Sequence, residues 1–265
     1  MLFLGVGRIN KKLGLIPVAV IAILIVLMLL LGMRGQYVFN PPYLVLIVGL
    51  IFVTGVGLVV AYLSIKSYLA TGSTVLLIMS MAFVVQSIVP IGSGVVATFS
   101  PSATVAIAAL GLIVGSVVQM FAAIQGSFRS APIGAEHRKS RLASACLLML
   151  FLSLLVILLP FYPGFPVLFV NAAGVTSLND AFYALSIIFF LVGSSLFMRL
   201  YVQSKSSALY WYSLALLLWG VGTFGVAFQL RFSDIIAWTG RSGWYTGSLY
   251  YLVALRSASV ENKQD

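Results

Sequence analysis

Residues 13–31 read LGLIPVAVIAILIVLMLLL, an unbroken apolar run without a charged side chain. A helix needs about 20 such residues to cross roughly 30 Å of hydrocarbon. The basic residues Arg8, Lys11 and Lys12 precede the run, which is also typical of a signal peptide. The run is too long for the apolar region of a signal peptide, and no small-residue cleavage site follows it. We therefore predict that it is retained as the first membrane span.

Similar apolar runs fill the rest of the chain. Of its 265 residues, 62% are hydrophobic and 8% are charged, whereas soluble domains carry about 25% charged residues. The mean hydropathy is +1.14. This composition excludes a soluble globular protein, a disordered chain and a nucleic-acid-binding module, and it predicts an all-α fold, a polytopic transmembrane helix bundle. The eight predicted spans cover residues 14–33, 42–64, 70–93, 103–125, 142–162, 180–202, 207–230 and 234–255.

The basic residues predict which ends of the spans face the cytoplasm, because cytoplasmic loops carry an excess of Lys and Arg. With the N-terminus inside, the outer loops hold only Arg34 and Arg231, and Arg241 falls within the last span. The inner segments hold the other twelve of the fifteen, Arg8, Lys11, Lys12, Lys66, Arg129, Arg138, Lys139, Arg141, Arg199, Lys205, Arg256 and Lys263. We therefore expect a multi-pass protein of the cell (plasma) membrane with both termini cytoplasmic. The net charge of +10 then reflects topology and attraction to anionic membrane lipids, and no nucleic-acid partner is expected.

The chain contains two similar halves. Tyr62-Leu-Ser-Ile-Lys66-Ser67 resembles Tyr201-Val-Gln-Ser-Lys205-Ser206, and Phe99-Ser100 precedes the fourth span as Phe232-Ser233 precedes the eighth. Gly111-Leu-Ile-Val-Gly115-Ser116 resembles Gly243-Trp-Tyr-Thr-Gly247-Ser248. We predict two four-span repeats, residues 1–130 and 131–265, with chance similarity between apolar helices as the alternative. An even number of spans makes such copies parallel in the membrane, related by an axis along its normal.

The same motif contains pairs of glycines four positions apart, Gly111 with Gly115 and Gly243 with Gly247. Two glycines at this spacing leave a flat strip on a helix, which lets the backbone of another helix approach closely. We predict that these four glycines serve helix packing. The packing partner is either another helix of the same bundle or a second copy along a homodimer seam.

Arg241 is the basic residue that falls within a predicted span. It lies about seven residues into the last span, roughly 10 Å from the outer edge. An Arg at the centre of a span costs about 2.5–3.5 kcal/mol on insertion scales, so it should face the bundle or water and have a partner. Gln86 should lie at a similar depth, and Asp234 and Asp180 open the eighth and sixth spans on the outer side. In the first half, the position equivalent to Arg241 is near Ala109.

Two interpretations of Arg241 follow from this placement. In the first, Arg241, Gln86 and the outer carboxylates of Asp234 and Asp180 form a site for an anionic or polar ligand. In the second, Arg241 is a structural clamp between helices or snorkels to the outer head groups. Trp219, Trp244 and Tyr245 lie deeper than an interfacial aromatic belt and either wall the ligand pocket or pack in the core.

The sequence lacks the side chains that proton relays, retinal binding, metal binding and nucleophilic catalysis need. No Asp, Glu or Lys falls in the middle of a span, which argues against a carboxylate proton relay and a retinal Schiff base. The chain has one histidine, His137, and one cysteine, Cys146, so neither a metal cluster nor a nucleophile with a neighbouring base is expected. We therefore expect no catalytic residues, no metal and no cofactor, and we interpret the protein as a non-enzyme.

The end of the chain resembles a known family. Leu209–Val226 and Trp238–Leu255 are similar to the last two spans of the membrane-embedded sensor regions that precede PAS domains in archaeal and bacterial histidine kinases. The similarity covers about 50 residues, and Trp238, Gly240, Arg241 and Gly247 match a W-x-G-R motif followed by glycines and aromatics. In that family the two spans lead into the signalling part, whereas here only SASVENKQD follows Arg256. The resemblance therefore implies an archaeal or bacterial sensor region without PAS, HAMP, kinase or cyclase modules.

Three functions agree with these features. The first is a non-enzymatic membrane sensor, a signal-input module in which a small ligand or a membrane state changes the helix packing around Arg241. The second is a transporter or permease for a small amphipathic or anionic solute, and the third is a structural subunit of a larger membrane complex. Apart from membrane lipids, the expected partners are a second copy, a membrane-complex partner or a separate signalling protein.

Overall fold

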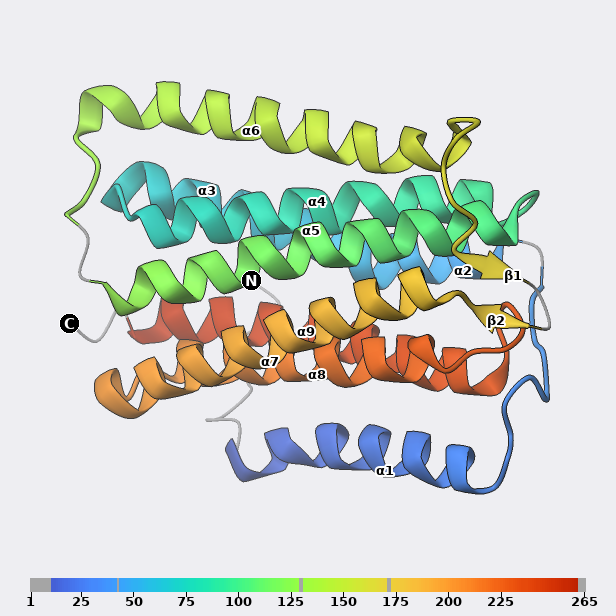
Figure 1. Cartoon of the computed structure of the whole chain (residues 1–265). Helices are drawn as coiled ribbons and strands as arrows, with labels where there is room; N and C mark the ends of the chain where they lie inside the picture. The colour runs from blue at the N-terminus through green and yellow to red at the C-terminus, as the bar shows by residue number, and fades with distance from the viewer. Residues whose placement is uncertain (1–10, 42, 129–130, 171–172, 262–265) are drawn as a thin grey trace.

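Long helices lie side by side and fold back and forth between two ends of a bundle (Figure 1). The computed structural model describes residues 11–41, 43–128, 131–170 and 173–261, apart from the side chains of residues 12 and 259–261. The long helices of these residues are α1 (Ile16–Leu30), a continuous helix made of α2 (Leu44–Gly49), η2 (Leu50–Gly55) and α3 (Val56–Thr71), α4 (Thr74–Val96), α5 (Pro101–Ser127), α6 (Ala135–Leu158), α7 (Ser177–Ser204), α8 (Ser207–Ala227) and α9 (Ile235–Glu261). The shorter elements are η1 (Lys11–Leu15), η3 (Leu159–Phe161), β1 (Phe169–Val170) and β2 (Gly174–Val175).

Length and composition make this an integral, multi-pass membrane protein. Within the described residues, seven helical segments are long and apolar enough to cross a membrane, and together with α9 they confirm the predicted all-α bundle. The predicted eighth span, 234–255, is helical over nearly its whole length, but α9 is not among the seven apolar segments. Because hydrocarbon offers no partner to polar side chains, a helix of this composition belongs inside the bundle.

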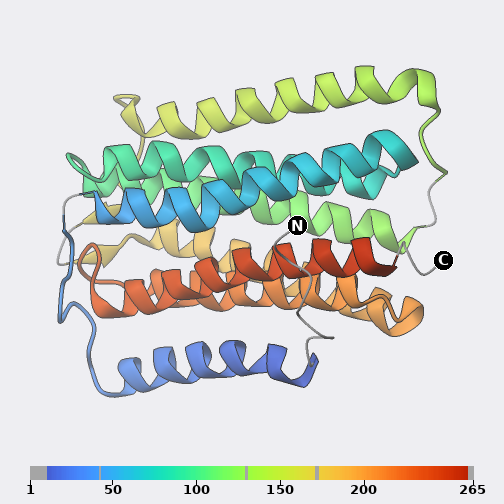
Figure 2. The same cartoon turned by 180° about the vertical axis from the view of Figure 1, so that it is seen from behind.

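The burial of the helices matches that requirement. Leu249 is the only exposed residue of α9 between positions 235 and 258, and Phe224 is the only exposed residue of α8. In contrast, α6 buries only Ser153 and Val156, and α1 buries only three of its side chains. Both views show α1 and α6 on opposite outer sides of the bundle (Figures 1 and 2). The outer helices therefore present apolar side chains to lipid, while α8 and α9 form the centre.

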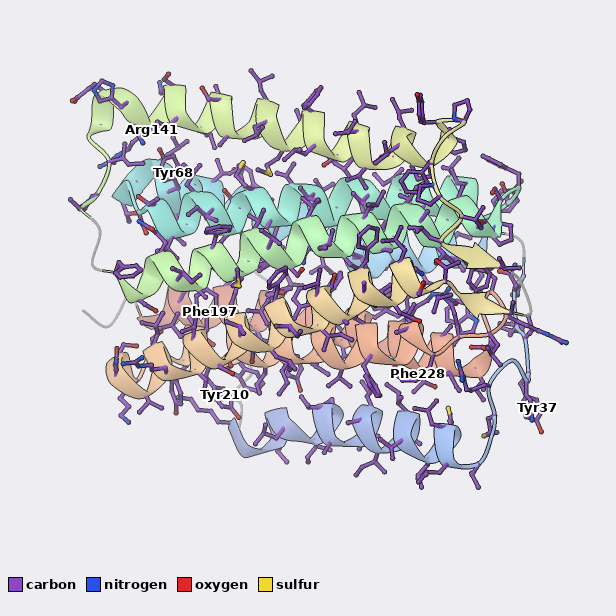
Figure 3. All side chains as sticks on the ribbon, in the orientation of Figure 1. Tyr37, Tyr68, Arg141, Phe197, Tyr210 and Phe228 are labelled. Carbon is purple, nitrogen blue, oxygen red and sulfur yellow. The ribbon has the colours of Figure 1, made fainter. Side chains whose placement is uncertain are left out.

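The two ends of the bundle differ in charge. One end, here called the basic end, is where α1 begins and α9 ends, and it carries Arg141; the other, the hairpin end, carries Tyr37 (Figure 3). Two basic residues, Arg34 and Arg231, lie at the hairpin end. The described side chains at or near the basic end include Lys11, Lys66, Arg138, Lys139, Arg141, Arg199, Lys205 and Arg256. Arg8, Arg129 and Lys263 and the side chain of Lys12, which the prediction also placed inside, lie outside the described residues.

Two connections differ from the sequence prediction. Helix α6 begins at Ala135, seven residues before the predicted span, so His137 and Arg138 lie in its first turns and not in a loop. Arg138 explains the early start, because its guanidinium donates hydrogen bonds to the carbonyl oxygens of Leu69, Ala70 and Ile133 at 2.8–2.9 Å and so joins α6 to the end of α3. At the other end, the predicted outer loop contains a small antiparallel hairpin, β1 with β2.

The first helix of each predicted half packs against the other half. Helix α1 lies against α8 and α9, whereas α6 lies mainly against α4. The remaining three helices of each half pack consecutively, α3 on α4 on α5 and α7 on α8 on α9. This reciprocal arrangement is the one expected for two parallel copies around an axis along the membrane normal, and the duplication itself stays a prediction.

A glycine-lined contact joins α8 to α9 along their length. A Cβ atom on Gly240 would lie 2.5 Å from the carbonyl oxygen of Gly222, and one on Gly243 would lie 3.0 Å from the Cα of Gly222. Gly247 similarly faces the backbone of Ala215. In the other half, a Cβ on Gly111 would overlap Val89 of α4. Gly111, Gly243 and Gly247 thus face helices of the same chain, and so does Gly115, which faces Gln86 at 3.3 Å.

We predict that Gly240→Ala destabilises the bundle by about 1–3 kcal/mol, because the added methyl group meets backbone that cannot move aside. Thermal unfolding of the purified protein in detergent measures the effect. Gly220→Ala in α8 is the matched control, since its Cβ would lie 3.5 Å from that of Phe190, an ordinary contact. Equal midpoints for the two variants would show that the α8–α9 contact is not close-packed.

Candidate functional site

Six elements line a partly open cavity in the half of the bundle nearer the hairpin end. The space in which the centre of a water molecule fits has a volume of about 80 Å³. Apolar side chains form most of its wall, and Arg241 supplies its only charge among the described residues. The lining residues are Val45 and Gly49 of α2, Val53 of η2, Gln86, Val89, Pro90 and Ser93 of α4, Ala108, Gly111 and Leu112 of α5, Trp219 of α8, and Arg241, Trp244 and Tyr245 of α9.

The cavity brings together five of the six residues predicted to bind a ligand. Gln86, Trp219 and Arg241 line it together with Trp244 and Tyr245. The depth argument explains this agreement, because residues at equal distances from the membrane surface on neighbouring helices lie opposite each other. Whether they bind a ligand stays a prediction, but the structure places them around one space.

Arg241 is 6% exposed and uses few of its hydrogen-bond donors. Its Nη1 donates to the hydroxyl oxygen of Ser233 at 3.1 Å, and its guanidinium lies 5.3 Å from the ring centroid of Phe232 and 5.2 Å from that of Trp238. A guanidinium has five N–H donors. Its hydrogen bond joins α9 to the segment just before α9 and not to a neighbouring helix. This geometry does not favour a clamp between helices, and the burial does not favour snorkelling to head groups.

Asp234 opens α9 at the hairpin end, as predicted, but it does not line the cavity. It is fully buried and caps the helix by accepting a hydrogen bond from the backbone N–H of Ala237. Its carboxylate accepts hydrogen bonds from four backbone N–H groups, those of Gly35, Leu230, Arg231 and Ala237, at 3.0–3.4 Å. Backbone donors at a helix N-terminus stabilise a carboxylate well. Asp234 therefore fixes the start of α9, and it makes no described ion pair with Arg241.

Two further polar groups of the cavity have no hydrogen-bond partner among the described residues. Both the oxygen and the nitrogen of the Gln86 amide are buried and unpaired, and so is the Nε1–H of Trp219. Leaving a buried polar group unpaired costs about 1–3 kcal/mol. The nearby Trp244 differs, since its Nε1–H donates to Thr223 at 3.2 Å. The unpaired groups of the cavity are therefore two N–H donors, those of Gln86 and Trp219, and one acceptor, the Gln86 oxygen.

Irregular backbone surrounds the same space. In η2, residues 50–55 form a π-helical segment within an otherwise α-helical span, and such segments occur frequently at functional sites. Across the cavity, α4 continues through Pro90, which cannot donate a backbone hydrogen bond. The Thr54 hydroxyl of the π segment donates to the carbonyl oxygen of Ser87 at 2.8 Å and so supports α4 near the proline. Helix α4 thus continues past Pro90 to Val96 without a break.

Aromatic rings form one wall of the cavity. The rings of Trp219 and Trp244 stack with centroids 5.8 Å apart and an interplanar angle of 19°. The ring centroid of Tyr245 lies 5.7 Å from that of Phe52 in the π segment. Three other aromatic residues of α8, Tyr210, Trp211 and Tyr212, are also buried. The Tyr212 hydroxyl donates to Gln119 of α5 in the core.

The cavity lies between the two predicted halves. Four of its α4 and α5 residues are separated from its α8 and α9 residues by 133 positions, one more than the 132 positions between the glycines of the repeated motif. The pairs are Gln86 with Trp219, Ala108 with Arg241, Gly111 with Trp244 and Leu112 with Tyr245. This correspondence is what a site on an axis between two copies would show.

Sequence reasoning missed part of the site. Val45, Gly49 and Val53 line the cavity because α2 and η2 pack across it, and no sequence signal marks a π segment. Ser233 could have been found, since it lies eight residues before Arg241 on the side toward the membrane surface. Asp180, which was expected near the site, is exposed at the start of α7 and lines a separate groove with Arg34.

Comparisons of the chain with known families, curated proteins and solved structures found no match. The resemblance to sensor regions of histidine kinases therefore stays a prediction, and the functional argument depends on the cavity.

We predict that Gln86→Leu keeps or raises the stability of the unliganded protein, because it removes an amide that has no partner. Gln119→Leu is the matched variant on α5, and it should lower stability by about 1–3 kcal/mol because it leaves the Tyr212 hydroxyl unpaired. Thermal unfolding in detergent, after bound small molecules have been washed out, measures both. An equal loss in the two variants would contradict the assignment of Gln86 to a vacant binding position.

Proposed function

We propose that the protein is a non-enzymatic membrane sensor, a signal-input module whose ligand binds in the Arg241 cavity. The observation that carries this proposal is a buried arginine beside an unpaired glutamine amide and an unpaired indole N–H around one cavity. The amide and the indole have no hydrogen-bond partner among the described residues, and the guanidinium of Arg241 makes one hydrogen bond, to Ser233. A ligand that pairs with them therefore stabilises the packing in which they meet.

The position of Arg241 on α9 couples the cavity to the end of the chain. The helix carries Arg241, Trp244 and Tyr245 in the cavity and continues to the basic end. Because its glycines fit closely against α8, the two helices should move as a unit against α2, α4 and α5. We propose that this movement carries the signal to the cytoplasmic side, where a separate signalling protein receives it.

The chemistry of the lining supports binding rather than catalysis. Among the described lining residues there is no Asp, Glu, His, Cys or Lys. The lining hydroxyl groups are those of Ser93, which donates to the carbonyl oxygen of Pro90 at 3.2 Å, and Tyr245, and no described lining residue supplies a base for either. Proton transfer and nucleophilic attack both need a titratable partner within hydrogen-bond reach.

The orientation in the membrane is part of the proposal. Helix α1 begins and α9 ends at the same end of the bundle, the end that carries most of the described basic side chains. Applied to this distribution, the positive-inside rule assigns the basic end to the cytoplasm and the cavity to the outer half of the cell membrane.

One observation favours a second function, a transporter for a small amphipathic or anionic solute. Transporters commonly bind substrate between two repeats, beside helices that are interrupted. Here the cavity lies between the two predicted halves and beside the π segment and Pro90. Transport requires that the cavity open alternately to both sides, which a sensor does not need.

We predict that Arg241→Ala leaves membrane insertion intact and abolishes ligand retention. Native mass spectrometry of the gently extracted protein should detect a small molecule on the unmodified chain and none on the variant. Arg231→Ala, at an exposed arginine of the hairpin end, is the control and should retain the molecule. An empty cavity in the unmodified chain together with a retained partner protein would favour the complex-subunit alternative.

We also predict that ligand changes the distance between α9 and α3. Spin labels at Tyr62→Cys and Leu249→Cys, both exposed positions, in a Cys146→Ser background report this distance by pulsed electron paramagnetic resonance. The small molecules released from the denatured native protein serve as the probe. A shift that is lost in Arg241→Ala supports the sensor, and an unchanged distance contradicts it. Uptake of the probe into proteoliposomes would instead establish the transporter.

A further inference from the structure

The groups that line the Arg241 cavity also indicate the chemical class of the ligand. Hydrogen-bond donors outnumber acceptors around it. Arg241, the Trp219 indole and the Gln86 amide nitrogen all carry N–H groups, whereas the Gln86 oxygen is the one fully buried, unpaired side-chain acceptor among the described lining residues. Such a set pairs best with a group that only accepts hydrogen bonds. An ionised carboxylate is of this kind, with two oxygens and about four lone-pair positions.

The charge of the cavity restricts the ligand further. Arg241 is its only charged lining residue among those described, and the nearby Asp234 carboxylate is already held by four backbone N–H groups. A buried charge is tolerated when it is paired. One arginine balances one negative charge, whereas a phosphate group carries about 1.5–2 negative charges at neutral pH. The balance therefore favours a monoanion.

The size of the cavity agrees with a small head group. The volume of the cavity is about 80 Å³, and one water molecule needs at least about 10–15 Å³ of such volume. The space thus holds a group of a few heavy atoms. Beyond the polar groups the wall is apolar, formed by Val53, Val89, Leu112 and the stacked rings of Trp219 and Trp244. This wall suits the hydrocarbon part next to a carboxylate.

We propose that the Arg241 cavity binds the head group of a monocarboxylate. Arg241 pairs with the carboxylate, and the N–H groups of Trp219 and Gln86 donate to its oxygens, while the stacked tryptophans contact the adjoining hydrocarbon. The proposal rests on the proposed function in that it takes the same cavity as the ligand site. Either a short water-soluble acid or a single-chain lipid acid supplies this chemistry.

The test is a titration of the purified full-length protein followed by tryptophan fluorescence, because Trp219 and Trp244 lie in the cavity wall. The probes are acetate and decanoate, each compared with its neutral amide, acetamide or decanamide, and with inorganic phosphate. We expect a saturable change with at least one acid and at least about tenfold weaker binding of its amide, because an amide has no charge to pair with Arg241. Acetate binding points to a soluble acid, and binding of decanoate alone points to a lipid acid.

Variants assign the binding to the cavity. Arg241→Gln should weaken acid binding by at least about tenfold, and Arg231→Gln should leave it unchanged. If Arg241→Gln does not fold, Trp219→Phe removes a single N–H donor from an apolar ring and should weaken binding about threefold or more while Trp244 still reports it. Unchanged binding in these cavity variants overturns the proposal.

Other outcomes separate this proposal from the proposed function. No saturable effect of either acid, equal effects of acids and amides, or tighter binding of phosphate overturns the carboxylate assignment. If an acid binds but the distance between positions 62 and 249 does not change, the sensor function fails and the ligand class stands. If the released native molecules change that distance and neither acid binds, the sensor function stands and the ligand class fails.

Discussion

The close contact between α8 and α9 is the constraint on which the rest of the structure depends. Helix α9 contains an arginine and many hydroxyl and glycine residues, so it is poorly suited to face hydrocarbon. Gly222, Gly240 and Gly243 allow the backbones of α8 and α9 to meet, and this contact holds α9 at the centre of the bundle. The same contact brings Trp244 onto Trp219 and directs Arg241 to the cavity. The lipid-facing helices α1 and α6 pack on the outside of the bundle, α1 against α8 and α9 and α6 mainly against α4.

The cavity forms where regular helix packing is interrupted on the opposite side. Pro90 and the π segment of η2 disturb two facing helices, and the Thr54 hydroxyl supports the disturbed backbone. The unpaired N–H groups of Gln86 and Trp219 and the unpaired oxygen of Gln86 cost free energy that the fold does not regain from any described contact. Natural sequences depart from good packing mainly at functional sites. Under the proposed function, a ligand that pairs with these groups returns the lost free energy.

The sequence predicted the bundle well because apolar runs of spanning length leave little choice of fold. The depth of Arg241 and Gln86 also followed from counting residues along straight helices, and this placed them at one cavity. Boundaries were less accurate where tertiary contacts decide them, as for α6, which starts early because Arg138 binds carbonyl oxygens at the end of α3. The burial of Asp234 was missed for a similar reason, since its N–H partners come from the segments that fold around it. The π segment has no sequence signature, so the α2 side of the cavity could not be predicted.

The predicted duplication explains why a single arginine occupies the cavity. At the corresponding positions the first half has Ala108, Gly111 and Leu112 where the second half has Arg241, Trp244 and Tyr245. On an axis between two copies, equivalent residues face one shared space, so two arginines there would repel each other in a medium of low dielectric constant. A tryptophan at position 111, in addition to Trp244, would also fill the space. A site for one monoanion between two similar halves therefore requires that the halves differ, with small residues on one side to leave room and a charged residue on the other.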